Sequence, residues 1–287
     1  VNFTALIVAA DTTINAGENG GIDTKGGAYG INVISGANLV INGGTYYGGG
    51  TAVQAQKGTV TINGGHFAVE PFSDARYGYD FLLNCLDANY KNGSAKIIVK
   101  GGTFVNFNPA DCKAEGDGTD FVPDGYSVIS EKHGEDIWYT VVKGTGATAG
   151  TQTELDNAIT NNAASTVKLT TAGTYTLPSL DSKDVTIIGT KDTVIDMKGK
   201  INNNATSVAF EGVTVAFSND IYVGFQHTGK LTYKDCTITG KQFLYANDVE
   251  FINCTFVQDA VDYNVWTYGA GSVLFKDCNF DCKGKAV

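Results

Sequence analysis

The sequence predicts an all-β fold in which the chain winds into stacked parallel coils, a right-handed parallel β-helix. Two observations predict this fold. One eight-residue pattern recurs four times in the C-terminal half, and a related pattern recurs three times in the N-terminal half. The C-terminal copies start at Val208, Leu231, Val249 and Val273, which gives coils of 18 to 24 residues. Self-similarity at such a period is typical of solenoids, whose repeats pack only against their neighbours.

Each C-terminal copy predicts a strand, a one-residue corner and a second strand. Its third position is always aromatic, and apolar residues recur at alternate positions, as in a strand with one buried face. Its fifth position is Gly, Asp or Asn, residue types that tolerate left-handed backbone at a corner. We therefore expect equivalent positions to stack about 4.8 Å apart in successive coils. The aromatic column is Phe210, Tyr233, Phe251 and Phe275, and the corner column is Gly212, Asp235, Asn253 and Asp277.

Three of the six cysteines share the first inward position after the corner, namely Cys236, Cys254 and Cys278. A buried thiol packs as a small hydrophobe, and three residues of one column cannot all pair with one another. We therefore expect reduced thiols, although the spacing of adjacent coils also permits a disulfide.

The N-terminal half contains a second version of the pattern, in residues 39–46, 60–67 and 97–104. Its corner is Gly-Gly, which supplies positive φ without strain and lets coils approach closely. The longer gap before the third copy predicts an insertion within 68–96, which either packs on the barrel or forms a ligand surface. Two alternating runs within 121–142 then surround a polar turn and predict a β-hairpin that covers the open end.

The chain is predicted to form two domains. Residues 1–142 form the first β-helix with its C-terminal hairpin cap, and 143–150, rich in Gly, Thr and Ala, form a flexible linker. Residues 151–287 form the second β-helix, opened by a short capping helix with a capping box at Thr151 or Thr153. The apolar stripe expected on this helix is Leu155, Ala158 and Ile159. Both ends look cut, so we expect a piece of a longer protein.

Composition argues against several classes of function. The formal net charge of −10, without a basic stripe, argues against nucleic acid. No apolar run reaches the length of a membrane span, so no membrane insertion is expected. The single arginine and the three isolated histidines leave no recognisable acid–base set. The Asp and Asn corner column is better explained by side chain–backbone hydrogen bonds than by calcium, which needs several converging oxygens. We expect no catalytic residues, no metal and no cofactor.

The candidate binding residues are mostly aromatic. In the insertion they are Arg76, Tyr77 and Tyr79, and between the strands of the second β-helix they are Tyr222, His227, Tyr263, Trp266 and Tyr268. Trp266 and Tyr268 are two residues apart and share a strand face, whereas Tyr263 faces the other way. An open alternative is that these rings form inward stacking columns. Aromatic faces beside Asp and Asn suit both sugar rings and protein epitopes.

The corner motifs resemble those of pectate-lyase-superfamily β-helices of gut bacteria and their phages. The resemblance covers nearly the whole chain and rests on Ile41-Asn-Gly-Gly-Thr-Tyr, Ile62-Asn-Gly-Gly-His-Phe, Gly101-Gly-Thr-Phe and Phe251-Ile-Asn-Cys-Thr-Phe. It implies surface adhesins or phage tail and spike proteins, most of them without catalytic activity, on a cell surface or virion outside the cell.

These observations favour a non-catalytic surface or phage-tail module that recognises a glycan or a host-cell surface receptor. Two alternatives remain: a polysaccharide lyase or glycoside hydrolase acting at the loop face within 68–96, and a purely structural shaft. The expected partners are the glycan or receptor, together with a second copy in a homo-oligomer or further domains of a longer chain.

Overall fold

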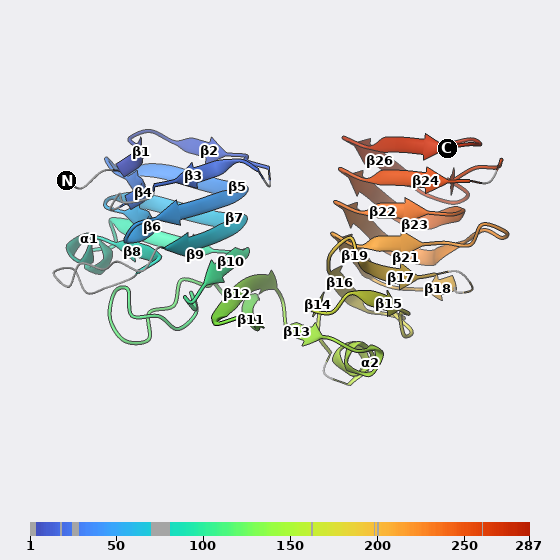
Figure 1. Cartoon of the computed structure of the whole chain (residues 1–287), viewed down its shortest axis with the longest axis horizontal. Helices are drawn as coiled ribbons and strands as arrows, with labels where there is room; N and C mark the ends of the chain where they lie inside the picture. Colours follow the sequence, from blue (N-terminus) through green and yellow to red (C-terminus); the bar gives the residue numbers. More distant parts are fainter. Residues whose placement is uncertain are drawn as a thin grey trace. The chain divides into compact units, whose positions relative to one another are not determined.

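The computed structural model describes residues 4–17, 19–24, 29–69, 81–161, 163–197, 199, 201–259 and 261–287, and only the backbone of Ile201. The fold is all-β, with 56% of residues in strands and 5% in helices, and its parallel coils stack into a β-solenoid of about 11 turns. This confirms the predicted fold class. The chain divides into two compact units, Val1–Gly144 and Thr145–Val287, each with its own hydrophobic core (Figure 1).

The first unit is built from two sheets, which are parallel except at the C-terminal hairpin, and the chain alternates between them. Its strands are β1 Thr4–Val8, β2 Thr12–Ile14, β3 Gly21–Asp23, β4 Tyr29–Val33, β5 Ala37–Gly48, β6 Thr51–Ala55, β7 Gly58–Val69, β8 Leu83–Cys85, β9 Ala95–Val99, β10 Gly102–Val105, β11 Tyr126–His133 and β12 Asp136–Lys143. One sheet has the order β1-β4-β6-β8, and the other has the order β2-β5-β7-β10-β12-β11. β3 also pairs with β5, and β9 pairs with β7.

Aromatic rings stack in the core of the first unit, as the repeat predicts. Phe67 lies between Tyr46 and Phe104, with ring centroids 5.0 Å apart on each side. The Gly-Gly corners of the same coils adopt positive φ, 98° at Gly44 and 119° at Gly65. A residue with a Cβ would be strained in that conformation, so the corner requires glycine.

The predicted hairpin caps the larger sheet of the first unit. β11 and β12 pair antiparallel along their whole length, and β12 also pairs antiparallel with β10, the last parallel strand of that sheet. The hairpin therefore covers an edge that would otherwise present unpaired backbone groups. Part of the predicted insertion is regular structure, because β8 pairs with β6 and is followed by the short helix α1 (Asp87–Lys91).

The second unit also consists of two sheets, and all of their pairings are parallel. Its strands are β13 Gly146–Ala149, β14 Thr166–Leu169, β15 Gly173–Tyr175, β16 Asp184–Ile188, β17 Thr193–Asp196, β18 Ile201–Asn203, β19 Ser207–Glu211, β20 Thr214–Ala216, β21 Val223–Lys234, β22 Thr237–Thr239, β23 Gln242–Ile252, β24 Thr255–Gln258, β25 Val265–Trp266, β26 Ser272–Lys276 and β27 Asn279–Cys282. The larger sheet has the order β13-β14-β16-β19-β21-β23-β25, with β18 beside β21 and β26 beside β23. The smaller sheet has the order β15-β17-β20-β22-β24-β27.

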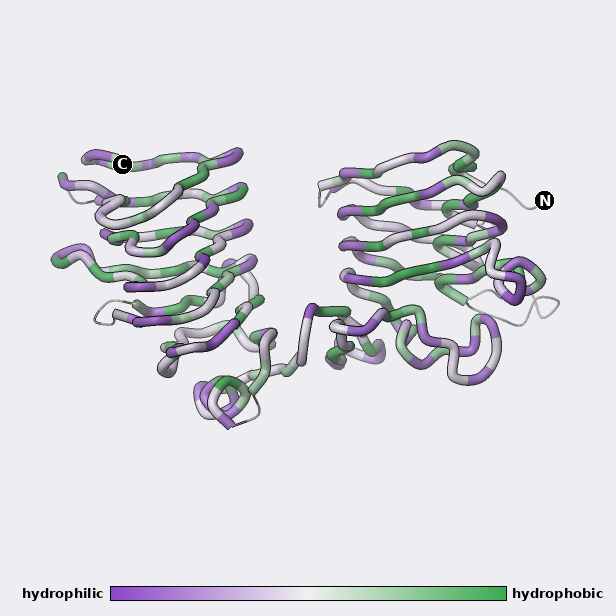
Figure 2. Tube along the Cα trace, turned by 180° about the vertical axis from the view of Figure 1, so that it is seen from behind, coloured by the Kyte–Doolittle hydropathy of each residue, from purple (hydrophilic) through white to green (hydrophobic). Residues whose placement is uncertain are grey.

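The predicted aromatic column of the second unit is a continuous stack. Ring centroids lie 5.3 Å apart between Phe210 and Tyr233, 4.8 Å between Tyr233 and Phe251, and 5.0 Å between Phe251 and Phe275. Each stacked pair contributes about 0.5–1.5 kcal/mol beyond burial. Hydrophobic segments accordingly lie over one another in successive coils (Figure 2).

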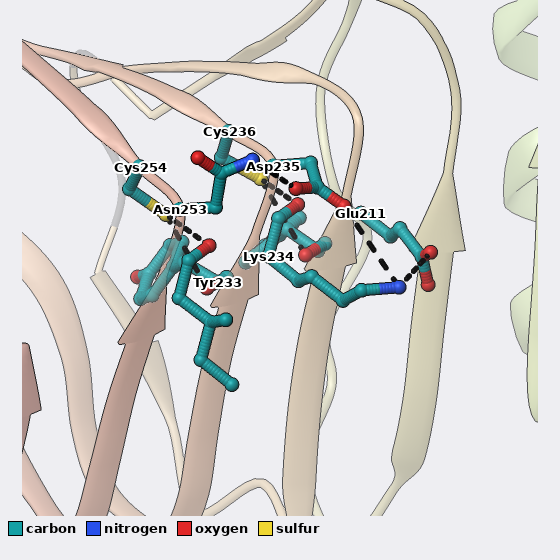
Figure 3. A network of polar contacts seen from close by, with 9 residues as sticks. Glu211, Tyr233, Lys234, Asp235, Cys236, Asn253 and Cys254 are labelled. Carbon is teal, nitrogen blue, oxygen red and sulfur yellow. Dashed lines mark hydrogen bonds and ion pairs between the residues drawn. The ribbon is translucent and has the colours of Figure 1, made fainter. Parts of the chain in front are cut away.

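The predicted corner column also adopts left-handed backbone. The φ angles are 55° at Asp235, 51° at Asn253 and 56° at Asp277. Asn253 Nδ2 donates a hydrogen bond to Asp235 Oδ1 of the preceding coil at 2.6 Å (Figure 3). On the outside of this corner, Lys234 Nζ lies 2.6 Å from Glu211 Oε1 and 3.8 Å from Asp235 Oδ2. The corners are thus held by contacts between neighbouring coils.

All six cysteines are free thiols, in agreement with the expectation. Cys236 and Cys254 each donate to a carbonyl oxygen of the preceding coil, that of Phe210 at 3.4 Å and that of Tyr233 at 3.3 Å (Figure 3). A hydrogen bond with Cys254, together with burial, raises the pKa of Cys236. Cys236 and Cys254 lie in the hydrophobic core of the second unit and Cys278 packs against it, so this column is part of the core packing.

A capping helix, α2 (Gln152–Thr160), opens the second unit. The Thr151 side chain accepts a hydrogen bond from the Glu154 N–H, and the Glu154 carboxylate accepts one from the Thr151 N–H, which is the predicted capping box. The predicted stripe of Leu155, Ala158 and Ile159 is buried. Neither helix that the structure describes is long and apolar enough to span a membrane.

The flexible linker predicted for residues 143–150 is wrong. Lys143 ends β12, and Gly146–Ala149 form β13, which pairs in parallel with β14. The segment is rich in Gly, Thr and Ala, a composition typical of linkers. The backbone N–H and C=O groups of Gly146–Ala149 nevertheless form regular hydrogen bonds with β14 of the next coil.

Candidate functional site

Aromatic side chains gather on the outer face of the larger sheet of the second unit. β21, β23 and β25 are neighbours there, and Val223, Gln242 and Val265 are buried at matching positions. Because side chains alternate across a strand, Trp266 beside Val265, and Tyr245 between the buried Leu244 and Ala246, point outward. The outward residues that we name the aromatic ribbon are Tyr222, His227, Tyr245, Trp266 and Tyr268.

The five rings of the aromatic ribbon form one continuous chain of contacts. Ring centroids are 5.1 Å apart between Tyr222 and Trp266 and 4.9 Å apart between Trp266 and Tyr268, both edge to face. Tyr245 continues the chain, 6.0 Å from Tyr268 and 4.4 Å from His227. Trp266 and Tyr268 keep 45% and 62% of their surface exposed. Inward stacking is therefore excluded for these two residues.

His227 is held in a left-handed backbone conformation, with φ at 53°. The register of β21 against β23 shifts between Gln226 and Thr228, which leaves His227 outside the ladder. An irregularity of this kind redirects a side chain, and left-handed backbone costs a residue with a Cβ roughly 1 kcal/mol. Here the redirected imidazole lies exposed against Tyr245. Asn204, at the equivalent place in the preceding coil, has a φ of 56°, so this left-handed corner repeats between coils.

Gly269 makes room for the central ring of the aromatic ribbon. A Cβ at this position would lie 2.6 Å from Cδ2 of Tyr245, closer than real atoms approach. The Tyr245 ring therefore packs directly on the backbone of the next coil. Any larger residue at position 269 would displace the ring from its place between His227 and Tyr268.

One end of the aromatic ribbon lies over a buried cation. Lys241 is only 9% exposed, and its Nζ donates to the backbone carbonyl oxygen of Asp220 at 2.9 Å. This Nζ also lies 3.8 Å from Asp262 Oδ2 and 5.1 Å from the centre of the Tyr222 ring. The Tyr222 hydroxyl donates to the Asp262 carboxylate.

The Asp262 carboxylate is ionised at neutral pH. A hydrogen bond from the backbone N–H of Tyr263 is the main cause that lowers its pKa, and the Tyr222 hydroxyl, Lys241 and Lys285 act in the same direction. Burial, followed by the interaction with Asp262, raises the pKa of Tyr222. The phenol therefore keeps its proton and stays a hydrogen-bond donor.

The ring of Tyr263 is not part of the aromatic ribbon. Lys285 Nζ lies 4.5 Å from the centre of its ring and 3.4 Å from its hydroxyl. Its backbone carbonyl accepts a hydrogen bond from Gln258 Nε2 at 3.2 Å. Among the described residues no ring contact joins it to Trp266 or Tyr268, but its backbone is hydrogen-bonded to the Tyr222 hydroxyl, so it meets the aromatic ribbon through its backbone and not through its ring.

The predicted binding residues Arg76, Tyr77 and Tyr79 lie outside the described residues. The structure does bring together Tyr222, His227, Trp266 and Tyr268, all predicted from the sequence. Sequence reasoning missed Tyr245, Lys241 and Gly269. Tyr245 could have been found from its place between the apolar residues Leu244 and Ala246, which marks an outward position on a strand.

A second aromatic cluster lies on the hairpin of the first unit, also unforeseen from the sequence. Trp138 stacks on His133 with centroids 4.0 Å apart and meets His66 edge-on at 4.7 Å. His133 Nε2 lies 2.9 Å from Glu131 Oε2. Because His66 belongs to β7 and Trp138 to the hairpin, the cluster anchors the cap to the coils. Both tryptophans and all three histidines of the chain thus lie in this cluster or in the aromatic ribbon.

Among the described residues we find neither a metal-binding cluster nor a surface depression with a pair of carboxyl groups. In the part of the chain that the structure describes, no group of three or more His, Cys, Asp or Glu side chains could hold a metal ion. Two shallow surface depressions each contain a single carboxylate, Asp181 in one and Asp23 in the other. Hydrolysis of a glycosidic bond usually needs a pair of carboxyl groups across the bond, and neither depression supplies such a pair.

Comparisons of the chain with protein-family models, curated proteins and solved structures found no match. The class of this protein is therefore described from its fold and its surface alone. The chain is a β-solenoid that carries a continuous exposed chain of aromatic rings across neighbouring coils.

Proposed function

We propose that the chain is a non-catalytic recognition module that binds a glycan on the aromatic ribbon. The observation that carries the proposal is the continuity of the five rings, with Trp266 and Tyr268 largely exposed. Contiguous exposed apolar surface on a soluble fold marks an interaction site. Aromatic rings pack against the C–H faces of sugars, and Asp262 and the Tyr222 hydroxyl supply hydrogen-bonding groups for sugar hydroxyls.

The scaffold supports this proposal because it holds the rings in place before a ligand arrives. The ladder of successive coils fixes the backbone of Tyr245 and Trp266, and Lys241 and Trp266 pack against the Tyr222 ring, so little side-chain freedom is lost on binding. We propose a surface adhesin or a phage tail or spike protein, located outside the cell on a cell surface or virion. Its partner is then a glycan or a glycan-bearing receptor of a host cell, with a second copy or further domains completing the assembly.

A glycan array followed by affinity measurement tests the proposal. Trp266→Ala and Tyr268→Ala should each weaken binding to any glycan found by about tenfold or more, because central aromatic residues dominate binding energies. Leu274→Ala is the matched control, since Leu274 is an exposed apolar residue of β26, 49% exposed, outside the aromatic ribbon. Circular dichroism should show all three variants folded.

Other outcomes favour other functions. Release of reducing ends from a bound glycan would support a polysaccharide lyase or glycoside hydrolase acting at the loop face within 68–96. Binding that survives both aromatic substitutions would move the site away from the aromatic ribbon. No glycan or receptor binding at all, in the intact chain, would leave a structural shaft.

A further inference from the structure

We propose that the aromatic ribbon selects uncharged oligosaccharides and that Asp262 excludes acidic ones. This inference rests on the proposed function and adds to it the class of ligand and a specificity-determining residue. It is based on the charged side chains at the two ends of the aromatic ribbon and on the contacts that these side chains already make within the protein.

At the Tyr222 end, Asp262 carries an exposed negative charge, Lys241 is buried, and Lys285, the exposed lysine beside Asp262, is already engaged. The Lys241 side chain is 11% exposed, with its Nζ bonded to the Asp220 carbonyl oxygen, whereas the Asp262 side chain is 46% exposed. Lys285 lies over the Tyr263 ring. An acidic sugar packed against Tyr222 would place its carboxylate near that of Asp262, and like charges at such distances repel.

At the His227 end, the next cation along β21 is also engaged. Lys230 Nζ lies 3.0 Å from Glu250 Oε1 on the neighbouring strand. The carboxylate of an acidic sugar would have to displace Glu250 in order to pair with Lys230. The chain as a whole carries a net charge of −10, which adds a general repulsion of anions. Neither end therefore offers an unengaged lysine among the described residues.

Uncharged sugars meet favourable chemistry on the same surface. A sugar hydroxyl can donate to the ionised Asp262 carboxylate, and hydrogen bonds to a charged acceptor are the strong ones. The rings come from three successive coils, about 4.8 Å apart, so the surface extends beyond one sugar ring. The ligand should therefore be an oligosaccharide that contacts several rings at once.

The test compares matched ligands at pH 8. The probes are uncharged gluco-, galacto- and manno-configured tetrasaccharides, the corresponding monosaccharides, and the same tetrasaccharides with one terminal uronic acid. The wild-type chain should bind an uncharged tetrasaccharide about fivefold or more tighter than its acidic counterpart, and tighter than the monosaccharide. Asp262→Asn should bring the ratio of the two affinities close to one.

Asp259→Asn is the control for Asp262→Asn. It removes the same charge from a neighbouring position, but Asp259 pairs with Lys283 at 2.7 Å and contacts no ring of the aromatic ribbon among the described residues. It should leave the preference for uncharged ligands unchanged. Preference for the acidic ligand, tetrasaccharide binding no tighter than monosaccharide binding, or an unchanged ratio in Asp262→Asn would overturn this inference and leave glycan binding standing. Failure of every member of a full glycan array to bind would instead overturn the proposed function.

Discussion

At the scale of single residues, His227 combines an unfavourable backbone conformation with a contact that the site needs. Its φ of 53° lies in a region that β-branched residues avoid most strongly and that Asn tolerates best after Gly. We expect His227→Val to lower the free energy of unfolding by about 1–2 kcal/mol. His227→Asn should cost less than about 1 kcal/mol, because the backbone stays allowed and only the contact with Tyr245 is lost.

Urea denaturation of both variants, with glycan binding measured in parallel, tests this prediction. Thr232→Val is the control, since it places the same side chain on the extended backbone of the same strand and should change stability by no more than about 0.5 kcal/mol. Equal stabilities of His227→Val and His227→Asn would show that the left-handed conformation costs nothing here.

Residue-level prediction worked where neighbouring coils repeat the same environment. The stacked ring of Tyr233 and the left-handed corners at Asp235 and Asn253 follow from their columns, because each position sees its own equivalent above and below. Tyr245 and Gly269 belong to no such column. Their contact depends on how two different coils meet, so the repeat contains no signal for it.

At the scale of elements, the segment between β10 and β11 is attached to β8 through a partly buried carboxylate. Glu115 Oε1 accepts a hydrogen bond from the Cys85 N–H at 2.5 Å, and its Oε2 is buried without a hydrogen-bond partner. Burial raises the pKa of Glu115 to about 6, although the Cys85 N–H acts against this shift. The same burial, with Glu115 beside it, raises the pKa of Cys85 to about 12.

This carboxylate predicts a pH dependence of stability. With the folded-state pKa of Glu115 near 6 and the unfolded value near 4.5, the folded chain holds the extra proton between these values. The contribution of Glu115 to stability is therefore fully present below about pH 4.5 and is lost as pH rises through about 6. Because the side chain is only partly buried, solvent screens the effect, and we expect no more than about 1 kcal/mol.

Glu115→Gln should remove that pH dependence. The variant cannot ionise, so its stability relative to the wild-type chain should rise between about pH 4.5 and 6 and then stay level. Chemical denaturation at several pH values measures the difference, and Asp117→Asn, which alters an exposed residue of the same segment, should give a flat difference. A flat difference for Glu115→Gln as well would contradict the raised pKa.

Elements were predictable from the sequence when their own residues specify them. The capping box of Thr151 and Glu154 and the buried stripe of α2 are local patterns, and the structure contains both. The strand Gly146–Ala149 was missed because its composition carries no preference of its own. It becomes a strand only through the ladder with Thr166–Leu169, a partner that local composition cannot reveal.

At the scale of the whole molecule, each unit encloses its own core. The first core contains the stack through Phe67, and the second contains the stack through Phe251. In a solenoid, stability is close to a sum of repeat and neighbour contributions, so damage spreads through adjacent coils. The separate cores therefore predict that a defect in one unit leaves the stability of the other unchanged.

Native-state hydrogen exchange of the intact chain tests this independence. Phe251→Ala should lower the free energy of opening by about 3–5 kcal/mol in the strands of Thr145–Val287, because both residues stacked on Phe251 lose a neighbour. Exchange within Val1–Gly144 should not change. Phe67→Ala should give the converse result, since Phe67 is stacked between Tyr46 and Phe104 in the other core. Faster exchange in both units from either substitution would mean that the two cores open as one cooperative structure.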